Sequence, residues 1–148
     1  MKATQLLMVD HEQVTAMLDA LASGGDLEAS GVAFFWKIKD ALELHTEIEE
    51  TIFYPAVGQT DELKDMVLES LEEHKQVKTL LREMENLTSD SEKFEPKLKV
   101  LMENVEHHAE EEEEGKMFSK IRKLMSTEKL ERLGEELEAA KGKGSRAA

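Results

Sequence analysis

Five histidines are spread along the 148-residue chain, and His45 belongs to a spacing that can bind a metal. His45 and Glu49 are four residues apart, so on a helix they lie on one face, one turn from each other. An imidazole nitrogen and a carboxylate oxygen can then reach the same point, and a borderline metal such as iron accepts both ligand types. On a glutamate-rich helix this spacing also arises by chance, so the other histidines decide its meaning.

Apolar side chains recur at helical spacing along four long segments and a shorter fifth one. The long helices are expected at about residues 4–23, 30–55, 61–84 and 96–124. A short fifth helix is expected from about Glu128 to Ala140, followed by a frayed basic tail from Lys141 to Ala148. We predict an all-α fold, an antiparallel up-down-up-down four-helix bundle over residues 1–126. The short C-terminal helix and flexible tail occupy residues 127–148.

Each long helix has a histidine in its apolar stripe, and these four histidines are expected to lie at one depth. They are His11, His45, His74 and His108. Each lies 12 to 14 residues from the loop that it shares with the next helix. In an antiparallel bundle equal counts mean equal depth, about 20 Å at 1.5 Å per residue. Four imidazoles in a dry core would lack partners, whereas a metal centre satisfies them all.

The second carboxylate ligand comes from the glutamate run of the fourth helix, and two positions compete for it. Counting forwards from Val105 favours Glu112, whereas counting backwards from Met117 and Ile121 favours Glu113. A π-bulge, which is common at functional sites, would produce this disagreement of one residue. His108 lies on the apolar seam and His107 points about 100° away, as a flanking group. The other glutamates of the run are expected to be solvated.

Two further residues near the predicted ligands have open roles. Tyr54 follows His45 by nine residues, about half a turn off the ligand face, and is expected to be a packing residue. Lys78 lies four residues after His74, where it either snorkels at the surface or brings its ammonium group near the carboxylates of the site.

The composition limits the partners that the protein can have. A net charge of −14 argues against binding to nucleic acid or to anionic membranes. No apolar run is long enough to span a bilayer, and no export segment is visible at the start of the chain. The absence of cysteine rules out disulfides, thiolate metal sites and iron–sulfur clusters. We expect a cytoplasmic protein whose partner is a small molecule; the oligomeric state is left open.

Together these motifs resemble the hemerythrin-like, or HHE cation-binding, family, in the family's order over about residues 5–125. They are the isolated His11, His45-x-x-x-Glu49 followed by Phe53-Tyr54-Pro55, the isolated His74, and His107-His108-Ala109-Glu110 leading to Met117-Phe118. The resemblance implies a non-haem di-iron centre with carboxylate and oxo-type bridges. Manganese and zinc are the alternative metals. The resemblance further implies that the metal ligands are His11, His45, Glu49, His74, His108 and a glutamate at 112 or 113.

Lys78 departs from the family pattern, because oxygen-carrying hemerythrins have a further histidine at that place. One iron would then have an extra open position. The resemblance and the open position imply binding of dioxygen, peroxide or nitric oxide, with a catalase-like or protective activity as one form of this function. The alternative is an iron-binding or redox-sensing module without turnover.

Overall fold

The computed structural model describes residues 1–23, 29–88 and 91–147, and within these ranges the side chains of residues 29–32, Glu112 and 145–147 are not described. The regular secondary structure of the described residues is entirely helical. The bounds of the helices are α1 (Ala3–Ser23), α2 (Ala29–Ile48), η1 (Glu49–Phe53), α3 (Tyr54–Val57), α4 (Asp61–Glu85), α5 (Phe94–Glu106), η2 (His107–Met117), α6 (Phe118–Leu124) and α7 (Thr127–Ala147).

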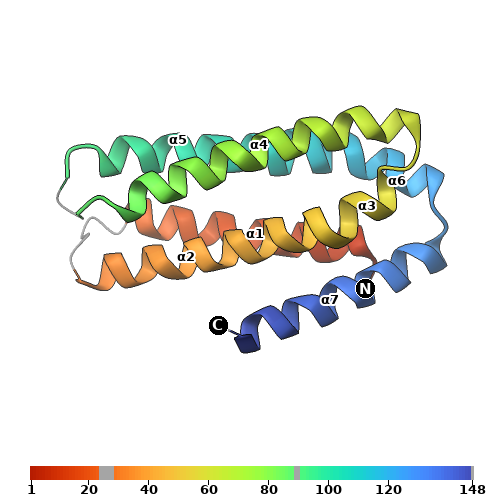
Figure 1. Cartoon of the computed structure of the whole chain (residues 1–148), viewed down its shortest axis with the longest axis horizontal. Coiled ribbons are helices and arrows are strands. Elements are labelled where there is room, and N and C mark those ends of the chain that lie inside the picture. Colours follow the sequence, from red (N-terminus) through yellow and green to blue (C-terminus); the bar gives the residue numbers. More distant parts are fainter. Residues whose placement is uncertain (24–28, 89–90, 148) are drawn as a thin grey trace.

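Four rods form the body of the molecule, and successive rods run in opposite directions (Figure 1). The first is α1, the second runs from α2 through η1 to α3, the third is α4, and the fourth runs from α5 through η2 to α6. The predicted all-α antiparallel four-helix bundle is therefore confirmed. The remaining helix, α7, lies outside the four rods beside α1 and α2 (Figure 1).

Buried apolar side chains form two clusters, one toward each end of the bundle. On α1, Leu7 belongs to one cluster and Val14 to the other. His11 stands between them. His45, His74 and His108 are placed in the same way: along each rod, buried residues of one apolar cluster precede the histidine and buried residues of the other follow it. The histidines therefore form a polar layer between two apolar ones, at the common depth that the sequence predicts.

Two stretches of the bundle are π-helical, so that residues five apart share a face there. The backbone N–H of Tyr54 donates to the carbonyl of Glu49, and that of Phe118 donates to the carbonyl of Glu113. The π segment in the fourth rod is η2. It lies where counting apolar positions forwards from Val105 and backwards from Met117 gives ligand positions that differ by one residue. The segment η1 in the second rod has no such signature, and we did not expect it.

Helix α7 begins near the predicted start, but it continues past Ala140 to Ala147, where a frayed tail is expected. Its buried residues Leu130, Leu133 and Leu137 join the apolar cluster that includes the start of α1. A Cβ at Gly134 would collide with the backbone carbonyl of Met1, so this glycine permits the close crossing. The packing of α7 against α1 and α2 explains why a segment with a tail-like composition is helical.

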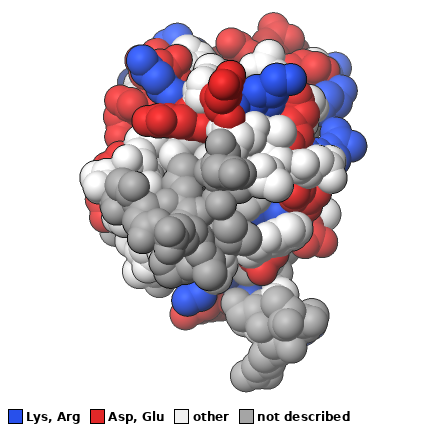
Figure 2. All heavy atoms as spheres, turned by 90° about the vertical axis from the view of Figure 1, so that its left-hand side faces the viewer, with Lys and Arg blue, Asp and Glu red and all other residues white. Residues whose placement is uncertain are grey.

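Charged side chains surround one end of the bundle. Figure 2 looks onto the end where α1 stops and α2 begins, and acidic and basic side chains are interspersed around it. Among the helices that the structure describes, none has the length and apolar character that a membrane crossing requires.

Candidate metal centre

The structure brings six of the seven sequence-predicted site residues together inside the bundle. All six are at most 7% exposed, and both glutamates are fully buried. They are His11, His45, Glu49, His74, His108 and Glu113. The seventh, Glu112, belongs to η2, but its side chain lies outside the described part of the structure.

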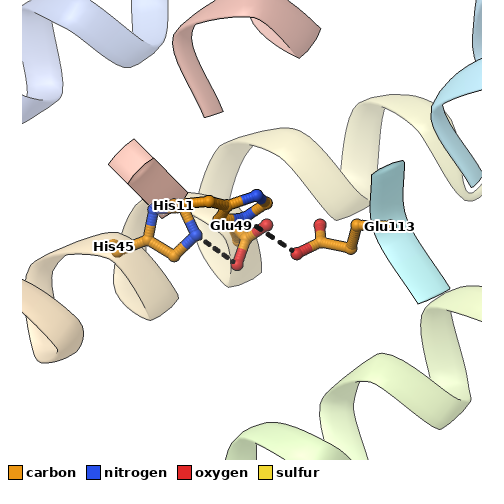
Figure 3. A group of neighbouring side chains, drawn as sticks. All are labelled: His11, His45, Glu49 and Glu113. Atoms are coloured by element: carbon orange, nitrogen blue, oxygen red, sulfur yellow. Dashed lines mark ion pairs between the residues drawn. The ribbon is translucent and has the colours of Figure 1, made fainter. Parts of the chain in front are cut away.

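A first group of candidate ligands consists of His11, His45, Glu49 and Glu113 (Figure 3). The Nε2 atom of His45 lies 3.1 Å from Glu49 Oε1, and that of His11 lies 3.4 Å from Glu113 Oε1. One ligand atom from each residue fits within a cluster whose members are all within 4.8 Å of one another. Two imidazoles and two carboxylates from three rods therefore face one point.

A second group consists of Glu49, His74 and His108, and it shares Glu49 with the first. His74 Nε2 lies 3.1 Å from the same Oε1 atom of Glu49 and 3.1 Å from His108 Nε2. Glu113 also contacts both groups, because its Oε1 atom lies 2.8 Å from His108 Nε2. The two carboxylates are thus placed to bridge two adjacent cations.

The opposite ring nitrogen of every one of these histidines is held by a carboxylate. The Nδ1–H groups of His11, His45, His74 and His108 donate to oxygens of Glu114, Asp10, Glu50 and Glu73 respectively, over 2.7–3.1 Å. We call Glu114, Asp10, Glu50 and Glu73 the outer carboxylates. A hydrogen bond at Nδ1 fixes the tautomer and turns Nε2 inward with its lone pair free, the arrangement found for metal-binding histidines.

Several polar atoms at the centre are buried without a hydrogen-bond partner among the residues that the structure describes. They are Nε2 of His11 and of His45, both oxygens of Glu49, and Oε1 of Glu113. An unpaired buried polar group costs about 1–3 kcal/mol, so five of them in one place require compensation. A pair of divalent cations would compensate all five, because imidazole and carboxylate are ligands for iron, manganese and zinc. The residues therefore fit a binuclear metal centre.

Without a metal, the carboxylates of the centre hold protons on the imidazoles of His45 and His108. Burial alone would lower the pKa of His45, but the charge of Glu49 and the hydrogen bond to Asp10 raise it to about 10. Burial likewise opposes the charge on His108, yet Glu113 and Glu49 raise its pKa to about 12. Burial would raise the pKa of Glu49, and the neighbouring His45 cation holds it well below its usual range.

These shifts predict opposite pH trends for the metal-free and the metal-loaded protein. In the metal-free protein the raised pKa of His45 and His108 contributes stability that is complete below pH 6.5 and is lost as pH rises toward about 10 for His45 and about 12 for His108. The lowered pKa of Glu49 contributes stability above pH 4.5 that is lost on acidification. Metal binding must displace the imidazole protons, so metal affinity rises with pH.

Calorimetric metal titrations in buffers of different ionisation enthalpy measure the displaced protons directly. We expect the release of about two protons per chain at pH 7, since His45 and His108 are protonated there. Thermal melts of the metal-free protein between pH 6.5 and pH 9 should show falling stability. No proton release at neutral pH would contradict the predicted protonation of the two imidazoles.

Of the two glutamates that the sequence left as alternatives, Glu113 is buried and contacts His108, and the side chain of Glu112 lies outside the described part of the structure. His108 and Glu113 are five residues apart, the spacing that shares a face in a π-helix, whereas four residues would share a face in an α-helix. The π-bulge interpretation of the fourth helix is therefore confirmed by η2. The expectation that the other glutamates of the run are solvated is wrong for Glu114, which accepts a hydrogen bond from His11.

Tyr54 is a member of the site that the sequence interpretation assigned to packing. Its hydroxyl group lies 3.3 Å from His74 Nε2 and 3.4 Å from His108 Nε2, and it donates to Glu113 Oε2 over 3.3 Å. The π segment η1 places Tyr54 on the face of Glu49, five residues earlier. A regular helix would have turned the ring away, and the only available signal was its position after the His45–Glu49 pair.

Lys78 and His107 lie at the edge of the centre. The ammonium group of Lys78 contacts Glu50, the outer carboxylate of His74, over 2.8 Å, so Lys78 approaches the site through a carboxylate. His107 is about half exposed and pairs with Glu73 and Glu111, which agrees with its interpretation as a flanking group. Lys78, which contacts Glu50, thus occupies the position at which a further histidine ligand would follow His74.

The fold and the site together define a cation-binding four-helix protein. The model of the family described as "Hemerythrin HHE cation binding domain" matches residues 2–121. The chain therefore belongs to this family. A solved structure, the hemerythrin HHE cation binding domain-containing protein of Mycobacterium kansasii, superposes with a TM-score of 0.87 at 21% identity. The match covers 99% of this chain and 89% of that one, and at this identity it shows the fold alone.

Two curated relatives are longer than this chain. A protein of Nostoc sp. named DNA nickase is 28% identical over 97% of this chain and 40% of its own length. A hemerythrin-like protein of Schizosaccharomyces pombe is 26% identical over 76% of this chain and 56% of its own length. The chain thus spans about half of each relative. The expectation that it binds no nucleic acid stays a prediction.

Proposed function

We propose that the protein holds two non-haem iron ions and binds dioxygen or hydrogen peroxide at an open position of one of them. Decomposition of peroxide, a catalase-like protective activity, is the form of this function that we favour. The proposed ligands are His11, His45, Glu49 and Glu113 for the first ion, and Glu49, His74 and His108 for the second. Glu113 also contacts His108 and so serves as a second bridge.

The observation that carries the proposal is the small number of ligands on the side of His74 and His108. Among the described residues the second group offers Glu49, His74 and His108, and Glu113 adds a fourth ligand through its contact with His108. The ammonium group of Lys78 pairs with Glu50 and so adds no ligand to the second group. The second ion would therefore keep room for a small molecule, beside the hydroxyl group of Tyr54.

The chain's own residues create the conditions for this chemistry. Two iron ions, when bound, supply the redox equivalents that dioxygen binding or peroxide turnover requires. Glu49 and Glu113 provide negative charge between the two groups. The apolar clusters on both sides of the polar layer keep bulk water away. In the metal-free protein, burial and the charges of Glu113 and Glu49 raise the pKa of Tyr54, so its hydroxyl stays protonated and can donate a hydrogen bond.

The test begins with metal analysis of protein purified anaerobically under reducing conditions. We expect about two iron ions per chain and, after addition of hydrogen peroxide, oxygen release at an electrode. Protein that takes up no iron would contradict the proposal. Bound iron without oxygen release would leave the non-catalytic iron-binding module.

Replacing Tyr54 with phenylalanine separates metal binding from turnover. The variant keeps every proposed ligand but loses the hydroxyl group beside the second group. We expect an unchanged metal content and oxygen release about 100-fold slower, because positioned proton donors contribute on this scale. Rates per bound iron, measured at matched metal content, decide the matter. Unchanged turnover would show that the hydroxyl has no part in it.

A further inference from the structure

Helix α7 reaches the proposed metal centre although it lies outside the four rods. The ammonium group of Lys141 pairs with Asp10 Oδ1, and the other oxygen of Asp10 accepts a hydrogen bond from His45 Nδ1 over 3.1 Å. A chain of two contacts thus joins the fifth helix to a buried histidine. Lys141 and Asp10 are 131 positions apart in the sequence.

The position of Lys141 is set by the packing of α7 rather than by its own side chain. Leu137, one turn earlier, is fully buried in the cluster with Leu6 and Leu7 of α1. One turn earlier again, Leu133 is 5% exposed. Beyond Lys141, Gly144 lies so close to Leu44 of α2 that a Cβ there would collide with that side chain. Contacts on both sides of Lys141 therefore hold α7 against α1 and α2.

Lys141 also completes the surroundings of a buried charge. Asp10 is 5% exposed, and its two oxygens have one described cationic partner each, Lys141 and His45. A hollow of about 250 Å³ reaches His45 from outside, and Lys141 and Gly144 line it from α7. Removing the ammonium group would leave one oxygen of Asp10 unpaired beside this hollow, free to reorient and to release its hold on His45.

We propose that Lys141 is a positioning residue of the metal centre: through Asp10 it fixes the orientation of His45, so that binding of the first ion depends on α7. The inference rests on the proposed metal binding and adds the fifth helix to the site. The second group has its own outer carboxylates, Glu50 and Glu73, which pair with Lys78 and His107 from within the bundle. Loss of Lys141 should therefore affect one ion and spare the other.

The experiment compares Lys141→Met, Lys141→Arg and Lys143→Met in the full-length chain. Lys141→Met removes the charge and keeps an apolar stem, Lys141→Arg restores a cation, and Lys143 is an exposed lysine two residues further on. Cobalt(II) titrations followed by optical absorption and calorimetry resolve the two binding steps. We expect Lys141→Met to weaken the affinity of one binding step about 10-fold and to leave the other step unchanged. This is the lower end of the effect seen when residues that hydrogen-bond to a metal ligand are replaced. Lys141→Arg should recover most of the affinity, and Lys143→Met should match the wild type.

The imidazole of His45 gives a second readout that a general loss of stability would not change. In zinc-loaded, ¹⁵N-labelled protein, Nδ1 of His45 should lose its hydrogen-bonded signature in Lys141→Met, while Nδ1 of His74 and of His108 keep theirs. Equal weakening of both steps, an unaltered His45 signal, or identical behaviour of Lys141→Met and Lys143→Met would overturn the inference. If the wild type binds no metal, the proposed function fails instead, so the two failures are distinguishable.

Discussion

Replacing Glu49 with glutamine is expected to abolish the binding of both metal ions. Glu49 is fully buried, and its Oε1 atom lies 3.1 Å from Nε2 of both His45 and His74. It belongs to both candidate groups. Glutamine has nearly the same shape but lacks the negative charge that offsets the charge of two cations. We expect the affinity for each ion to fall by at least about 100-fold.

Loss of affinity removes the stabilisation that the metal provides. At a free iron concentration of 100 Kd a single bound ion stabilises the folded state by about 2.7 kcal/mol. The wild type should therefore melt at a higher temperature with iron than without, whereas Glu49→Gln should melt at the same temperature in both conditions. The control is Glu47→Gln, an exposed position on the same helix. Two tightly bound ions in Glu49→Gln would contradict the role of this carboxylate as a bridge.

Glu113→Gln is expected to lose metal almost as severely, while Glu112→Gln keeps both ions. The reason is the π-helical spacing of η2, which brings Glu113 onto the face of His108, with Oε1 2.8 Å from Nε2. The two variants differ by one position and carry the same change of charge. Metal content and iron-dependent melting temperature, measured side by side, test which glutamate is the ligand. Metal loss in Glu112→Gln with retention in Glu113→Gln would reverse the assignment.

A one-residue deletion tests the π-helical explanation itself. Removing Glu110, an exposed residue between His108 and Glu113, leaves these two side chains four positions apart. An α-helix places residues at that spacing on one face, so the deleted chain should keep metal without a π segment. Metal loss in the deletion, together with an intact helical circular dichroism spectrum, would show that η2 contributes more than the alignment of His108 with Glu113.

Sequence spacing did not show which carboxylate accepts the Nδ1–H hydrogen bond of which histidine. His45 is held by Asp10, 35 positions away, and His108 by Glu73, also 35 positions away. Which surface carboxylate meets which imidazole depends on the rotation of each rod about its axis. That rotation follows from packing over the whole bundle, and the chain contains 33 acidic residues that could compete for these places.

Local patterns were sufficient for the architecture and for most of the candidate centre. Helical periodicity determined the four rods, and equal distances from shared loops determined that His11, His45, His74 and His108 meet at one level. Both inferences rest on the constant rise and turn of an α-helix, which every segment obeys independently of its neighbours. The phase disagreement around residues 105–117 similarly located the π segment η2.

Only the tertiary structure showed the burial of Glu113 beside His108, the inward turn of Tyr54, and the contact of Lys141 with Asp10. The positions of Glu113 and Tyr54 depend on where the backbone hydrogen bonds change from joining residues four apart to joining residues five apart. This change occurs at Glu49 and within η2. The contact of Lys141 depends on α7 folding back along α1 and α2. Such choices result from packing between segments far apart in the chain, and a local pattern of residues contains no information about that packing.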